Sequence, residues 1–171
     1  INKKSDVSIE RQDDNVTVKG PKGSIQLTIP VAYEISIDND LVQLLNHSKE
    51  KDASAFHGLY RSLLSGAVVG VSEGYTIELE LQGVGYKAQK DGNGLTLHLG
   101  FSHPVKVDAV EGVSFEAKGP SISISGIDKQ RVGQVAANII KFRDARKDPY
   151  KQKGVRYKGA VLRKKAGKKV K

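Results

Sequence analysis

The chain has 171 residues, of which 38% are apolar, and it contains no cysteine, which excludes a disulfide framework and any zinc site built on thiolates. No stretch of about 18 apolar residues could span a bilayer, and the first residues lack the apolar core of a secretory signal, so we expect a cytoplasmic protein with one domain or two small ones. The formal net charge of +9 favours an anionic partner.

The first half of the chain predicts a small antiparallel sheet followed by a helix. Alternation of apolar and polar residues predicts strands over residues 7–9, 16–18, 25–29 and 34–37. A glycine-containing turn over 20–23 joins the second strand to the third, and 38–40 closes the fourth. Helical periodicity follows and ends at Gly74. The apolar face of this helix is expected to comprise Phe56, Leu59, Tyr60, Leu63, Leu64, Ala67, Val68 and Val71.

The second half predicts the same order of elements. Strands are expected over residues 76–81, 85–88, 95–99, 105–107, 113–117 and 122–125. Residues 91–94, Asp-Gly-Asn-Gly, form a hairpin turn. Asp128 is a suitable N-cap for a second helix. The apolar face of that helix comprises Val132, Val135, Ala136, Ile139 and Ile140.

The similar order of elements in the two halves indicates an internal duplication. The apolar positions of the two helices match, Phe56 with Val132, and the strand over 25–29 resembles the strand over 95–99, although chance could also produce such a likeness. The predicted fold class is α+β, with two similar small domains, each an antiparallel-rich sheet packed on one helix, and a basic C-terminal arm. The expected boundaries are 1–74 and 75–147 for the domains and 148–171 for the arm.

The positive charge is concentrated at the C-terminal end. Residues 141–171 contain 14 Lys and Arg but only two acids, so this segment has a net charge of +12, whereas residues 1–140 have −3. Cations at this density favour phosphate backbones, because each neutralised phosphate releases counterions. An anionic membrane is a weaker alternative, since the tail lacks an apolar helical face, and a solvated tail that only aids solubility is another.

Residues 147–159 carry the most specific pattern. Pro149 cannot extend the second helix, so the chain is expected to leave the body here as an arm. Gly154 and Gly159 would allow close backbone approach. The arm offers phosphate-binding cations at Lys151, Lys153, Arg156 and Lys158. Its tyrosines, Tyr150 and Tyr157, could stack on bases or pack against the body.

A catalytic or metal site is not expected. The four histidines, His47, His57, His98 and His103, show no ligand spacing, and no cysteine accompanies them. Residues 83–86, Gly-Val-Gly-Tyr, lack the third glycine and helix of a dinucleotide site, so a bulge or close backbone contact is favoured. We therefore expect no enzyme, no metal, no cofactor and no small-molecule substrate.

Six ordered motifs resemble bacterial-type ribosomal protein L6 of the large subunit. They are Val18–Gly23, His57–Leu59 with Gly70–Gly74, Gly83–Lys87, Leu99–Pro104, Ser125–Gln130, and Pro149–Lys151 with Lys153–Tyr157. The resemblance spans nearly the whole chain and implies two similar α+β domains without catalysis. It implies binding of large-subunit (23S-type) rRNA near the sarcin-ricin loop and stalk base, beside neighbouring ribosomal proteins and, transiently, translational GTPases.

Charge and resemblance together give the candidate RNA-binding residues. They are Lys129, Gln130, Arg143, Arg146, Lys147, Tyr150, Lys151, Lys153, Gly154, Arg156, Tyr157, Lys158, Arg163, Lys164, Lys165, Lys168 and Lys169. The chain departs from the family at Gln152, where glycine is usual, and in beginning at Ile1 without a short basic leader. A free-standing nucleic-acid chaperone or DNA-binding protein is the alternative. Deletion of 144–171 is expected to leave a folded, acidic body that no longer binds RNA.

Overall fold

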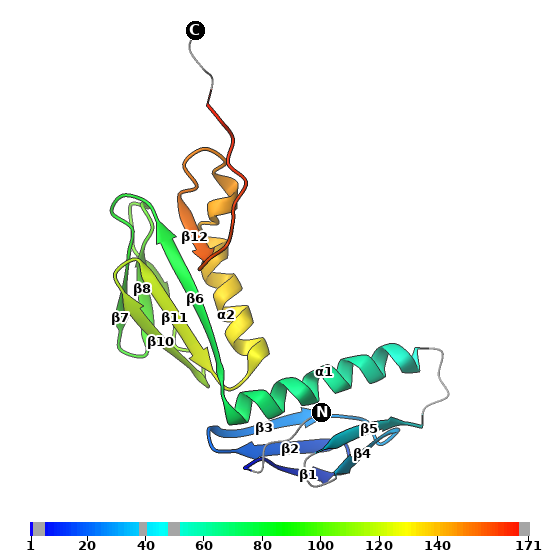
Figure 1. Ribbon diagram of the computed structural model, residues 1–171. Coiled ribbons are helices and arrows are strands. Elements are labelled where there is room, and N and C mark those ends of the chain that lie inside the picture. Colours follow the sequence, from blue (N-terminus) through cyan, green and yellow to red (C-terminus); the bar gives the residue numbers. More distant parts are fainter. Residues whose placement is uncertain (2–5, 38–40, 48–51, 168–171) are drawn as a thin grey trace. The chain divides into compact units, whose positions relative to one another are not determined.

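The computed structural model describes residues 1, 6–37, 41–47 and 52–167 (Figure 1). It divides into two compact units. The first comprises Ile1–Tyr75 with Ile127–Lys129, and the second comprises Thr76–Gly126 with Gln130–Lys171. Both contain antiparallel strands and one long helix, which confirms the α+β class.

The first unit contains two small antiparallel sheets and a helix. Its elements are β1 (Ser8–Gln12), β2 (Asn15–Gly20), β3 (Gly23–Thr28), β4 (Tyr33–Ile37), β5 (Val42–Asn46) and α1 (Ala53–Ser72). The sheets have the orders β1-β2-β3 and β4-β5. Alternate strand residues such as Val16 and Val18 are fully buried, and they form one core with Leu64, Val68 and Val71 of α1. The strand β5 was not expected from the sequence.

The apolar face predicted for α1 is wrong at its beginning. Phe56 and Leu59 are 42% and 47% exposed, whereas Leu64 and Val71 are fully buried. Helical periodicity gives the angular position of a side chain around the axis, but not whether a strand lies beneath that turn of the helix. Gly74, with φ +77°, follows α1 at its end as expected.

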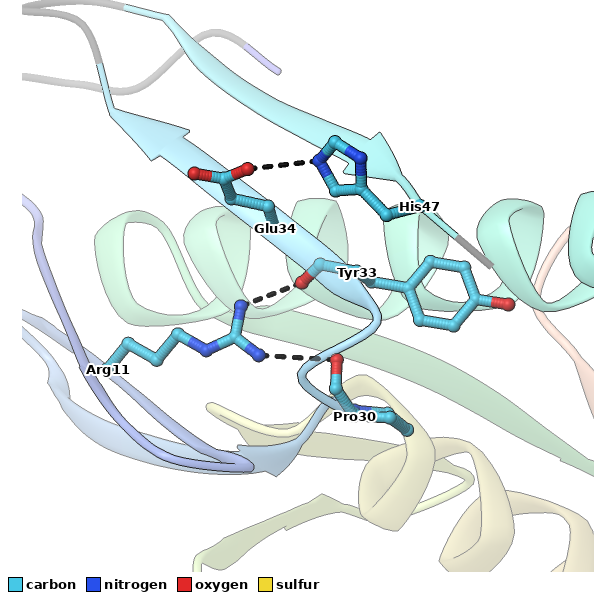
Figure 2. A network of polar contacts seen from close by, with 5 residues as sticks. All are labelled: Arg11, Pro30, Tyr33, Glu34 and His47. Atoms are coloured by element: carbon cyan, nitrogen blue, oxygen red, sulfur yellow. Dashed lines mark hydrogen bonds and ion pairs between the residues drawn. The ribbon is translucent and has the colours of Figure 1, made fainter. Parts of the chain in front are cut away.

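Arg11 holds together the connection between β3 and β4 (Figure 2). Its guanidinium donates hydrogen bonds to the carbonyl oxygens of Tyr33 at 2.7 Å and Pro30 at 3.2 Å. It also donates to the carbonyl oxygen of Ile29 at 3.4 Å. Backbone carbonyls in an irregular connection need such donors. In the adjacent hairpin, Glu34 of β4 lies 3.0 Å from the ring of His47.

The second unit contains a four-stranded and a three-stranded antiparallel sheet. Its elements are β6 (Tyr75–Gln82), β7 (Lys87–Asp91), β8 (Gly94–His98), β9 (Val105–Val107), β10 (Val113–Lys118), β11 (Ser121–Gly126), α2 (Lys129–Phe142), the 3-10 turn η1 (Ala145–Lys147) and β12 (Gly154–Tyr157). The strand orders are β10-β11-β6-β12 and β7-β8-β9. The five apolar residues predicted for the face of α2 are all buried. They share one core with Leu79, Leu97 and Phe115.

The topology corrects how the two halves were matched. The strands β2 and β8 are each the middle strand of a three-stranded sheet. The turns before them both contain a residue in the left-handed region, Asp13 with φ +51° and Gly92 with φ +59°. The counterpart of β8 is therefore β2, and the match between 25–29 and 95–99 joined the wrong strands. Similar alternation in neighbouring strands makes such errors easy.

Candidate nucleic-acid interface

The candidate residues lie mainly in the segment after α2, which the structure folds back onto the second unit. Here β12 pairs antiparallel with β6, with Val155 opposite Leu81 and Tyr157 opposite Leu79. Val155 is fully buried in the core of this unit. The expectation that the chain leaves the body as an arm from residue 148 is therefore wrong for 154–157, because an edge of the four-stranded sheet was available for pairing. Figure 1 shows β12 lying beside β6.

The first turn of this segment is stabilised by an acid and a base that are two residues apart. Asp144 accepts a hydrogen bond from the backbone N–H of Arg146 at 2.9 Å and caps η1. The Arg146 side chain also binds Asp144, with Nη2 2.7 Å from Oδ2. This hydrogen bond lowers the pKa of Asp144. Part of the positive charge of Arg146 is therefore neutralised within the protein.

Asp148 organises the loop over residues 148–153. Its carboxylate accepts backbone hydrogen bonds from Tyr150 and Lys151 at 3.1 Å each and from Lys153 at 3.2 Å. The backbone donors of Lys151 and Lys153 lower the pKa of Asp148, because they stabilise its ionised form. The hydrogen bonds to Asp148 therefore fix the backbone of the loop that carries Lys151 and Lys153. In the sequence, the Asp-Pro pair is the feature that could have predicted this turn.

Gln152 occupies a conformation that favours glycine. Its φ is +54°, in the left-handed region, where side chains other than Asn and Asp are uncommon. This geometry explains why glycine is suited to this position. The Gln152 side chain compensates by donating from Nε2 to the carbonyl of Leu162 at 3.0 Å.

Gly154, which was expected to contact RNA, is buried in this structure. A Cβ at this position would lie 2.5 Å from the carbonyl oxygen of Arg143 and 2.6 Å from the nitrogen of Ala145, and φ is +148°. The close approach predicted for this glycine is thus made with the protein's own backbone. Gly159, with φ +76° and open space around it, lies instead in an exposed turn.

Two of the predicted cations are paired with acids of β6. Arg156 binds Glu80, with Nη2 3.1 Å from Oε2, and Lys158 binds Glu78. The hydrogen bond with Glu78 raises the pKa of Lys158. The sequence could not show these pairs, since β6 and β12 lie far apart in the chain. Because these two cations already have counter-charges, they contribute less to an anion-binding field than their number suggests.

Arg143 also has a structural role. Its guanidinium donates to the carbonyl of Leu99 at 2.8 Å and lies over two rings, 5.5 Å from the centroid of Tyr86 and 5.2 Å from that of Phe101. Such cation–π contacts hold the arginine in one position. Arg143 therefore links the end of α2 to the loops that flank β7 and β8.

The remaining cations of the segment are available to an external anion. Within the described residues, the side chains concerned make no ion pair and no hydrogen bond, although Lys147 and Lys153 lie close enough to Asp144 and Asp148 to interact with them electrostatically. They are Lys141, Lys147, Lys151, Lys153, Arg163, Lys164 and Lys165. All are exposed except Lys153, which is half-buried. Lys168 and Lys169 lie outside the described residues.

Lys141 is a member of this group that the sequence prediction omitted. It lines a hollow of about 280 Å³ together with Arg146, Lys147, Asp144 and Tyr157. Lys141 lies in the last turn of α2, four residues before η1, and this position in the sequence could have identified it as a candidate. The tyrosine rings add an aromatic surface to the group, because Tyr150 is 55% and Tyr157 43% exposed. Both rings thus leave room for stacking on a base.

The two weaker candidates lie elsewhere. Lys129 and Gln130 begin α2, about 20 Å along the helix axis from its last residue. The ammonium of Lys129 lies 5.8 Å from the ring centroid of Tyr75, and Gln130 is exposed. The structure therefore does not bring these residues together with the C-terminal cations.

The described residues show no grouping of metal ligands. No cluster of three or more His, Asp or Glu side chains within the described ranges could hold a metal ion. Among the described helices, none is long and apolar enough to cross a membrane. Gly83 and Gly85 form a turn before β7, in which a Cβ at Gly83 would lie 2.9 Å from the Tyr86 ring. The close contact at Gly83 is thus with a side chain and not with backbone, whereas Gly85, with φ +78°, has open space around it.

Comparison with known proteins gives a consistent result. The family model for ribosomal protein L6 matches the chain twice, over residues 4–74 and 82–158. The two matches confirm the expected duplication. The large ribosomal subunit protein uL6 of Clostridium beijerinckii is 44% identical over 166 residues, which are 96% of this chain and 91% of that protein.

Proposed function

The chain belongs to the ribosomal protein L6 family, and we propose that it is a structural component of the large ribosomal subunit that binds large-subunit rRNA through the C-terminal part of its second unit. The observation that carries this proposal is a group of cations, all exposed but Lys153, that form no ion pair among the described residues of the 148–153 loop, the tail and the end of α2. A folded body that fixes such a group offers phosphates a defined arrangement of charge. We propose no catalytic role.

The ion pairs of the second unit show which cations are neutralised within the protein and which remain for the proposed contact with RNA. Glu78, Glu80 and Asp144 neutralise the cations nearest to them, which keeps those cations at the protein surface. Within the described part of the chain, Lys151, Arg163, Lys164 and Lys165 form no such ion pair and can release counterions when they bind phosphates. The rRNA contact is therefore proposed to centre on the loop and tail, with Tyr150 and Tyr157 as stacking surfaces.

We place the rRNA contact near the sarcin-ricin loop and stalk base, in the cytoplasmic ribosome. The family resemblance supports this location and the proximity of other large-subunit proteins. Translational GTPases would then be transient neighbours. A rigid, non-catalytic protein can support such a region by holding RNA helices in a fixed arrangement, since phosphate contacts set position and orientation.

Site-directed RNA cleavage tests this proposal. The chain lacks cysteine, so a single cysteine can carry a hydroxyl-radical probe at Val161, whose side chain is 99% exposed, or at Asn93 in the β7–β8 turn as a control. After assembly into subunits, the probe at 161 should cut large-subunit rRNA at and around the sarcin-ricin loop, and the probe at 93 should cut elsewhere or weakly. Equal patterns from the two probes would contradict the proposed interface. Cleavage scattered over unrelated RNA would favour a general nucleic-acid chaperone instead.

A further inference from the structure

The tail after β12 lies beside the 148–153 loop instead of extending directly away from it. The backbone N–H of Ala160 donates to the carbonyl of Tyr157 at 3.1 Å, and Gly159 in this turn has a positive φ of +76°. A glycine with positive φ at the third position is typical of a type II turn, which reverses the chain. Residues after the turn can therefore approach the loop that precedes β12.

Two hydrogen bonds then join the tail to the loop. The Gln152 side chain donates from Nε2 to the carbonyl of Leu162 at 3.0 Å. The backbone N–H of Lys165 donates to the carbonyl of Pro149 at 2.9 Å. These contacts place the cations Arg163, Lys164 and Lys165 next to the loop that carries Lys151 and Lys153.

The backbone conformation of Gln152 is unusual for its residue type. Its φ of +54° is unfavourable for a residue other than glycine, asparagine or aspartate. Glycine would adopt this conformation without strain but has no side chain with which to reach Leu162. A strained conformation persists where the surroundings stabilise it. Here the backbone N–H of Gln152 donates to the carbonyl of Asp148 at 3.1 Å, and its side chain adds the bond to the tail.

We propose that Gln152 is a positioning residue that fastens the tail to the loop, so that both sets of cations form one surface before RNA arrives. This inference rests on the proposed rRNA binding. Cations held close together repel one another, so a fastening between them must supply attraction. The neutral amide of Gln152 does so without cancelling any positive charge, unlike the carboxylates that pair with Arg156 and Lys158. Order established before binding reduces the entropy lost on binding.

Hydrogen exchange measured by NMR on the full-length chain tests the fastening without RNA. In Gln152→Met, which keeps the length and the strain but removes the donor, exchange of the Lys165 amide should accelerate about three- to tenfold. Gln152→Gly should show the same acceleration although its melting temperature stays equal or rises, because the strain is relieved. Gln89→Met is the matched control, since Gln89 is an exposed residue of β7 whose side chain makes no hydrogen bond to the described residues.

Binding to a transcript of the large-subunit rRNA tests the consequence. Both Gln152 variants should bind about three- to tenfold more weakly than the natural chain, with an unchanged salt dependence, because the number of cations is the same. Unchanged protection of Lys165 in Gln152→Met would overturn the fastening, and lost protection with unchanged affinity would overturn the positioning role. A natural chain with a protected Lys165 amide that binds no RNA would overturn the proposed function but support the fastening.

Discussion

Asp148 is an acid within a basic segment, and it stabilises the backbone of that segment. Its carboxylate accepts three backbone hydrogen bonds from the loop that carries Lys151 and Lys153. In the sequence it counted only as one of two acids that reduce the positive charge of the segment. In the structure it fixes the backbone from which the neighbouring lysines project. The presence of an acid is therefore consistent with the phosphate binding that we propose for this segment.

The lowered pKa of Asp148 predicts how this loop responds to pH. A depressed carboxyl pKa gives stabilisation that is complete above the unfolded value of about 3.9 and is lost as pH falls through the folded value. The amide resonances of Tyr150, Lys151 and Lys153 should thus stay constant from pH 7 to about pH 5 and shift only below about pH 4. NMR titration checks this, with Asp148→Asn as the variant whose loop amides exchange faster at every pH. A transition near neutral pH would contradict the assignment.

Gly154 permits a second test at the residue scale. An added Cβ would contact backbone atoms of Arg143 and Ala145 at 2.5 and 2.6 Å, so Gly154→Ala should lower the free energy of unfolding by about 2–4 kcal/mol. Gly159→Ala is the matched control, because it shares a positive φ but meets open space, and it should cost about 1–2 kcal/mol. Urea denaturation measures both. Equal losses would show that steric contact at Gly154 is unimportant.

At the scale of elements, β12 is the last strand of the fold and also borders the proposed interface. Val155 is fully buried, and Ala145 of the preceding turn is too. Removing residues 144–171 would therefore expose the edge of β6 and part of the core. The expectation that this deletion leaves an intact body is corrected by the structure, since the charge boundary and the fold boundary do not coincide.

Two truncations separate these boundaries. A chain that ends at Gly159 keeps β12 and should unfold cooperatively, although it lacks the six cations beyond that residue. A chain that ends at Asp148 loses β12, and the loss of Val155 burial alone should cost about 1.5–3 kcal/mol. Its exposed β6 edge should also promote association. Thermal unfolding and sedimentation measure the difference. Identical stability of the two truncations would contradict the structural role of β12.

For the whole molecule, the sequence was sufficient for the architecture and the repeat. Regular alternation and helical periodicity predicted most strands and both helices, because burial on one face imposes those periods. The sequence did not predict β5, the exposed start of α1 or the position of β12. Each of these depends on which elements contact one another in the folded chain. The same reason explains the candidate interface, where charge density located the segment but Glu78 and Glu80 decided which cations remain available.

The division between paired and available cations is the central claim, and it predicts distinct electrostatic behaviour for different variants. The double variant Lys151→Gln/Lys153→Gln removes two available cations. The double variant Glu80→Gln/Arg156→Gln removes a paired acid and base and leaves the net charge unchanged. Both alter two polar side chains of the second unit. Any difference between them therefore reports on the availability of charge.

The most direct test measures the affinity of these chains for large-subunit rRNA by filter binding across a range of salt concentrations. For the natural chain, the logarithm of affinity should fall with the logarithm of salt with a slope of roughly −4 to −9, if about six to ten phosphates are neutralised. The Lys151/Lys153 variant should have a slope shallower by about 1.4 to 1.8, and the Glu80/Arg156 variant should keep the natural slope. A slope near zero for the natural chain, or equal changes in the two variants, would contradict the account.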